Sequence, residues 1–168
     1  MQWRLHTDPT IQLSIRSVAG KNIRYGGRSD LIEVTLKNAG RDTVILCLPG
    51  DGSFWGWRTP LMDWDVRETG GAALKRVPVA VCGNINPLGW NEVFRLPPGK
   101  ERKFSVAFPY YYPYKESQRY RLRLSYENRP DIGGMGTGTH DPDALRLLRA
   151  STPCKLVSNT LKVRVKTS

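Results

Sequence analysis

The residues best suited to binding chemistry are basic side chains that recur at every second position in two late segments. One segment carries Arg119, Arg121 and Arg123, and the other carries Lys162, Arg164 and Lys166. A period of two places side chains on one face of a β-strand. If the two segments pair, the six cations share one exposed sheet face that suits an anionic partner.

A second interpretation of this basic face stays open. Asp63, Asp65 or Glu33 from neighbouring strands could neutralise the cations, which would leave a solvated, internally paired surface. Like charges placed directly across two strands destabilise a sheet, so neutralisation would remove the need for a ligand. The formal net charge of +11, from 26 Lys and Arg against 15 Asp and Glu, favours nucleic acid, anionic glycans, lipid headgroups or an acidic protein as partner.

Aromatic side chains form a second candidate binding set. Trp55 and Trp57 follow a Pro-Gly turn, and Tyr110, Tyr111 and Tyr112 stand between two prolines. These positions are predicted to lie in loops, where aromatic rings can stack on sugars or peptides. Packing of the same rings against the body of the protein is the alternative.

The types of residue needed for catalysis are scarce. The chain has two histidines, His6 and His140, and Asp141 beside His140 is already explained as a helix N-cap. The glycine-rich stretch 133–139 lacks the Lys and Ser/Thr of a phosphate-binding loop, and no zinc or calcium motif occurs. We therefore predict a protein that is not an enzyme and needs no metal or cofactor.

The three cysteines predict one disulfide at most. Cys47 stands in an apolar run and is expected to be a buried thiol, whereas Cys82 and Cys154 are expected in loops. A Cys82–Cys154 bridge would close a loop of roughly 70 residues and would indicate an oxidising compartment. An extracytoplasmic or secreted location is favoured on this ground, and a cytoplasmic one stays open. No apolar run reaches the length of a transmembrane helix.

Alternating apolar and polar residues predict strands that would position all of these side chains. The alternating segments are 11–18, 31–38, 61–68, 102–108, 119–126 and 160–166. Residues 43–48 are nearly all apolar, as in a central strand covered on both sides, and residues 91–96 end in a Pro-Pro-Gly turn. We expect one antiparallel all-β domain over residues 1–168.

An insertion over residues 128–157 separates the last two predicted strands. It carries the only strong helix signal, with Asp141 as N-cap and Pro142 at the first helical position. Leu145 and Leu148 are expected to dock this helix on the β-domain.

Short motifs in the chain resemble a bacterial immunoglobulin-like β-sandwich domain. They are Leu36-Lys37-Asn38, Leu96-Pro97-Pro98-Gly99-Lys100 before Phe104-Ser105-Val106, Tyr120-Arg121-Leu122-Arg123, and Ser158-Asn159-Thr160-Leu161. The Trp64-Asp65-Val66-Arg67 segment before Gly70-Gly71 is similar to a strand of BsuPI-type intracellular proteinase-inhibitor domains. The resemblance implies a sandwich of seven to nine strands. The scarcity of catalytic residues and the two candidate binding sets predict a non-catalytic binding or accessory module that recognises a protein, glycan or other anionic partner. A proteinase inhibitor, which the BsuPI-type resemblance implies, is the alternative.

Overall fold

The computed structural model describes residues 10–18, 20–25, 31–48, 62–78, 91–109, 111–130 and 142–167. These residues form strands and a short helix: β1 (Ile11–Ser17), β2 (Asn22–Tyr25), β3 (Leu31–Asn38), β4 (Val44–Cys47), β5 (Met62–Glu68), β6 (Val93–Leu96), β7 (Glu101–Ala107), β8 (Arg119–Asn128), α1 (Pro142–Arg149), β9 (Cys154–Val157) and β10 (Leu161–Thr167). The protein is therefore mostly β, as the sequence predicts.

The first sheet has the strand order β1-β3-β7, and both pairings are antiparallel. Its central strand β3 alternates between apolar and polar residues from Ile32 to Lys37. Ile32, Val34 and Leu36 consequently point to one side and are fully buried.

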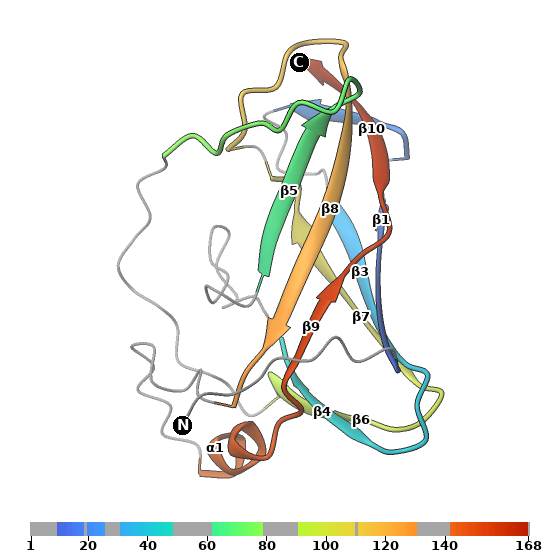
Figure 1. Ribbon diagram of the computed structural model, residues 1–168, viewed down its shortest axis with the longest axis vertical. Coiled ribbons are helices and arrows are strands. Elements are labelled where there is room, and N and C mark those ends of the chain that lie inside the picture. Colours follow the sequence, from blue (N-terminus) through green and yellow to red (C-terminus); the bar gives the residue numbers. More distant parts are fainter. Residues whose placement is uncertain are drawn as a thin grey trace.

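The second sheet has the strand order β2-β10-β8-β5. Strand β8 pairs antiparallel with both β5 and β10, whereas the edge strand β2 runs parallel to β10. Leu122 and Leu124 of β8 are buried beside Val66 and Trp64 of β5. The two sheets form two layers (Figure 1), and their inner faces share one apolar core.

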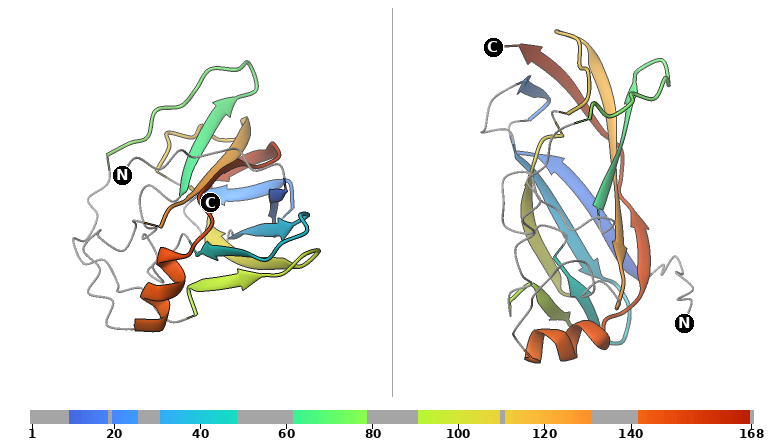
Figure 2. Two further views of the ribbon diagram at one scale, coloured as in Figure 1. Left: turned by 60° about the horizontal axis from the view of Figure 1, so that its bottom comes forward. Right: turned by 90° about the vertical axis from the view of Figure 1, so that its left-hand side faces the viewer.

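Strands β4 and β6 pair antiparallel beyond the ends of β3 and β7. The buried Asn38 holds this junction, because its Nδ2 donates to the carbonyls of Leu96 at 2.8 Å and Asp42 at 2.7 Å. Helix α1 lies at this end of the molecule (Figure 2), where Leu148 packs with Ile45 and Val93. Apolar surface on β4 is thus covered by a helix.

Strands β9 and β10 both pair with β8 and are separated by a β-bulge. Ser125 lies opposite Val157, but Leu122 lies opposite Leu161, so the β9–β10 side contains one extra residue. Ser158 keeps the bulge paired, since its N–H donates to Leu124 O and its Oγ accepts from Leu124 N.

The predicted strands and helix agree closely with the structure, with three differences. Strands β2 and β9 were not predicted: β2 has only four residues next to a glycine pair, and β9 lies inside the predicted insertion 128–157. Strand β4 is buried along its whole length, as expected, and pairs with β6; its place as a central strand stays a prediction. In α1, Leu148 is buried as expected, but the second buried residue of the helix is Ala144, and Leu145 is only half-buried.

Candidate anion-binding site

Pairing of β8 with β10 brings four cations directly opposite one another. Arg121 lies across from Lys162, and Arg119 lies across from Arg164. All four side chains are exposed on the outer face of the second sheet. The predicted pairing of the two basic segments is therefore confirmed.

An open depression of about 540 Å³ lies over these cations. We call it the basic depression, and its lining residues are Lys21, Asn22, Thr69, Arg119, Tyr120, Arg121, Lys162, Val163 and Arg164. The side chains of Tyr120 and Val163 are buried in the core, so these two residues contribute mainly backbone to the floor. Five of the nine lining residues are basic and none is acidic.

Backbone hydrogen bonds hold the surroundings of the depression in place. The Arg164 N–H donates to Lys21 O at 2.8 Å, which ties the turn before β2 to β10. The Thr69 hydroxyl donates to Arg119 O at 3.0 Å, which ties the turn after β5 to β8. The Arg164 guanidinium donates from Nε to Ser117 O at 3.1 Å, so its position is set before any ligand arrives.

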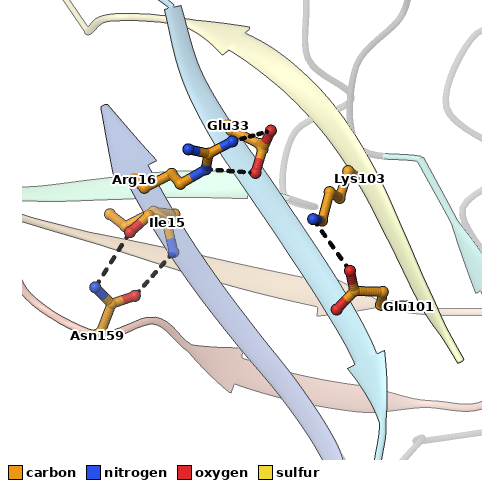
Figure 3. Close-up of polar contacts among 6 residues, drawn as sticks. All are labelled: Ile15, Arg16, Glu33, Glu101, Lys103 and Asn159. Carbon is orange, nitrogen blue, oxygen red and sulfur yellow. Dashed lines mark hydrogen bonds and ion pairs between the residues drawn. The ribbon is translucent and has the colours of Figure 1, made fainter. Parts of the chain in front are cut away.

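The carboxylates that could have neutralised the basic face have other partners. Asp65 binds the guanidinium Nε of Arg67 with both oxygens at 3.0 Å. Glu33 lies on the first sheet and binds Arg16 (Figure 3). Asp63 accepts a hydrogen bond from the backbone N–H of Trp64.

Within the described part of the chain, no carboxylate forms an ion pair with a cation of the basic depression. The alternative of an internally paired face is thus not supported for these residues.

Two of the six predicted anion-face residues lie outside the depression. Arg123 is one pair further along β8, opposite Asp65, and Lys166 is opposite Arg24 of β2. Lys21 belongs to the site but was not predicted, because it stands in a turn outside any alternating segment. Only the parallel pairing of β2 with β10 brings it beside Arg164.

The aromatic candidates divide between buried and undescribed residues. Trp55, Trp57 and Tyr110 lie outside the described residues. Tyr111 and Tyr112 are only 6% and 4% exposed, which supports the alternative that these rings pack against the body of the protein. The Tyr112 hydroxyl donates to Trp64 O at 2.7 Å, and burial raises the pKa of Tyr112 to about 12. These two rings pack in the core.

Among the cysteines, Cys47 lies where it was predicted and Cys154 does not. Cys47 is buried as expected, but Cys154 is buried at the start of β9 and does not lie in a loop. Cys82 is outside the described residues, and the described ones contain no disulfide. The Cys82–Cys154 bridge therefore stays a prediction.

The rest of the described chain offers no competing site of a familiar kind. No group of three or more His, Cys, Asp or Glu residues gathers there in a way that could hold a metal ion. His6, His140 and the glycine-rich stretch 133–139 lie outside it. Helix α1, of eight residues, is far too short to cross a membrane, and no other helix of the described residues is long and apolar enough to do so.

Comparison of the sequence with protein-family models and with curated proteins finds no match. An interpretation of function therefore depends on the fold and on the basic depression.

Proposed function

We propose that this protein is an immunoglobulin-like β-sandwich that acts as a non-catalytic binding module for an anionic partner. The strand order supports the fold assignment. In immunoglobulin domains, strands A, B and E share one sheet, and strands C, F and G share the other. Here β1, β3 and β7 take the first set of places, and β5, β8 and β10 take the second.

Two side chains typical of that fold also support the assignment. Immunoglobulin domains bury a tryptophan on strand C, and Trp64 is buried on β5. They also have a tyrosine at the start of strand F whose hydroxyl bonds backbone a few residues upstream. Tyr120 matches it, because its hydroxyl accepts a hydrogen bond from Lys115 N at 2.7 Å. Leu122 stands two residues later, where antibody-type domains have a cysteine.

The observation that carries the functional proposal is that the described residues lining the basic depression include five cations and no carboxylate. Its cations face one another as like charges in the Arg121–Lys162 and Arg119–Arg164 pairs. Each such pair costs a few tenths to about 1 kcal/mol. A bound anion would remove this repulsion and form charge-assisted hydrogen bonds with the arginines.

Retention on heparin, used as a generic polyanion, tests the proposal. We expect the protein to be retained at about 0.15 M salt, where the Debye length is still about 8 Å. Its affinity should fall linearly on a log–log plot against salt, because each neutralised anion releases counterions. The Arg121→Glu/Lys162→Glu variant should elute much earlier.

A matched control is Arg41→Glu/Lys100→Glu, which reverses one Arg and one Lys on exposed loops away from the depression. This control should elute close to the unmodified protein. Failure of the unmodified protein to bind, or equal losses in both variants, would refute a localised anion site. The BsuPI-type inhibitor stays the alternative, and no observation on the described residues favours it.

A further inference from the structure

Turns border the basic depression on three sides, which limits its extent. The turn containing Ser117 lies at one end and is held to β10 by a hydrogen bond from Ser117 N to Val165 O at 2.8 Å. The turns that carry Lys21 and Thr69 lie at the β2 side and the β5 side. The cations of the depression thus lie within a short stretch of the sheet, between these turns.

In the remaining direction, along β8, the outer face changes its charge. The residue pair after Arg121 and Arg67 is Arg123 and Asp65, and the next is Ser125 and Asp63. Further on, Glu127 lies opposite Lys155. A polyanion laid along the strands would therefore pass from a surface of cations to one where carboxylates stand among the cations.

The dimensions of a sheet place the four opposing cations close together. Adjacent strands are about 4.8 Å apart, and successive residues on one face of a strand are about 6.8 Å apart. Arg119, Arg121, Lys162 and Arg164 thus occupy the corners of a cell of roughly 5 by 7 Å. Their long side chains can converge on a ligand whose anionic groups sit on neighbouring atoms.

Charge density distinguishes phosphate from sulfate in so small an area. A phosphate monoester carries about −1.5 to −2 at neutral pH and has three strong acceptor oxygens. About three such groups balance the five lysines and arginines of the depression, whereas singly charged sulfates would need five groups in the same space. The volume of about 540 Å³ lies within the usual range for small-molecule sites.

We propose, on the basis of the function proposed above, that the basic depression binds a compact ligand with two or more adjacent phosphate groups. A multiply phosphorylated six-membered ring has this chemistry. It occurs both as a free inositol phosphate and as the headgroup of a phosphoinositide lipid. Phosphate clustering, and not polymer length, determines affinity at this site.

Isothermal titration with two probes of the same shape tests the inference. Inositol hexakisphosphate and inositol hexasulfate place six anionic groups on the same ring but differ in charge per group. We expect the hexakisphosphate to bind at least about tenfold more tightly near neutral pH at about 0.15 M salt.

Neutral substitutions locate the binding. Arg121→Gln/Lys162→Gln should weaken hexakisphosphate binding by at least about tenfold, whereas Arg41→Gln/Lys100→Gln should leave it within about twofold. Thermal unfolding of both variants shows whether each one is folded. Arg119→Gln provides a second variant of the site should the first prove unstable.

The outcomes separate this inference from the function that it rests on. Equal binding of the two probes, or heparin retention without hexakisphosphate binding, would overturn the phosphate inference and leave the anion-binding module standing. If the unmodified protein neither binds hexakisphosphate nor is retained on heparin, the phosphate inference and the anion-binding function are both refuted. The inference would also be overturned if an RNA or sulfated-glycan oligomer bound more tightly than the hexakisphosphate and its affinity kept rising with oligomer length. That result would identify a polymer site.

Vesicles distinguish the two sources of the ligand. Binding to phosphatidylcholine vesicles that contain phosphatidylinositol bisphosphate, but not to phosphatidylserine vesicles of matched surface charge, would assign the lipid headgroup. Binding of the soluble probe alone would assign the free compound. Equal binding to both kinds of charged vesicle would indicate simple surface attraction and count against phosphate clustering.

Discussion

The side chain of Asn159 binds the backbone of Ile15 with both of its polar atoms. Its Oδ1 accepts from Ile15 N at 2.8 Å, and its Nδ2 donates to Ile15 O at 3.2 Å (Figure 3). Asn159 lies in the bulge between β9 and β10, whereas Ile15 belongs to β1 of the other sheet. One side-chain amide thus makes the two backbone hydrogen bonds that a neighbouring strand would otherwise make, and it links the two sheets.

Replacing Asn159 by alanine should destabilise the protein by about 1–3 kcal/mol, because two backbone groups of Ile15 lose their partners. Urea unfolding followed by tryptophan fluorescence measures the change. Thr160→Ala, at the exposed neighbouring position, is the control and should change stability by less than about 0.5 kcal/mol. Similar effects of the two substitutions would show that the amide is not a link between the sheets.

A second prediction concerns the buried side chain of Asn128. Its Oδ1 accepts from Cys47 N at 3.0 Å, and its Nδ2 donates to Thr152 O at 2.7 Å, so it joins the end of β8 to β4 and to the segment before β9. Asn128→Leu should cost about 2–4 kcal/mol, since it removes both hydrogen bonds from a buried site. Cys47 N would keep only the Tyr126 hydroxyl as acceptor, at 3.2 Å, and Thr152 O would lose the Asn128 amide. Gln12→Leu, an exposed amide-to-leucine change on β1, should have little effect on the same unfolding curve. A loss below about 1 kcal/mol for Asn128→Leu would contradict this account.

The Arg16–Glu33 pair should make stability depend on pH. The Arg16 guanidinium donates to both carboxylate oxygens, at 2.7 and 2.9 Å, and this hydrogen bonding lowers the pKa of Glu33 below its usual value of 4.5. A lowered folded-state pKa stabilises the protein above the unfolded value, and the stabilisation is lost as pH falls through the folded value. Glu33→Gln should therefore be less stable than the unmodified protein at pH 7, and the difference should shrink below about pH 4.5.

Denaturation midpoints between about pH 3 and pH 7 measure this difference. In an Arg16→Gln background, the Glu33→Gln substitution should no longer produce a pH-dependent change, because the partner that lowers the pKa is absent. A pH-dependent difference that persists in that background would assign the effect to another group, such as Lys103.

Removing a cation from the basic depression should stabilise the ligand-free protein. Lys162 faces Arg121 directly, so Lys162→Thr removes one like-charge pair and should raise stability by a few tenths to about 1 kcal/mol. The gain should shrink at high salt, where the repulsion is screened. Lys37→Thr is the matched control, because Lys37 lies opposite Glu101 and its removal relieves no repulsion. If thermal unfolding shows that Lys162→Thr is no more stable than Lys37→Thr, the cations of the basic depression do not repel one another measurably.

The amino-acid sequence by itself determined which residues share a face of each strand. Alternation in Arg119–Tyr126 and Leu161–Lys166 follows from the two-residue period of an extended chain, so the basic and apolar faces could be predicted without knowing any neighbour. The helix at Pro142 could be predicted for a similar reason, because capping preferences act over a few consecutive residues.

Only the tertiary structure decided which of these faces meet and which charges stay unpaired. Lys21 reaches the basic depression through a parallel pairing of β2 with β10, two strands some 140 positions apart in the sequence. Asp65 could have paired with Arg123 across the sheet, but in the structure it binds Arg67 on its own strand. Tyr111 and Tyr112 look like loop residues in the sequence, but they are buried because the segment that carries them folds back onto Trp64. These outcomes depend on contacts between distant segments, and a local pattern of residue types contains no information about such contacts.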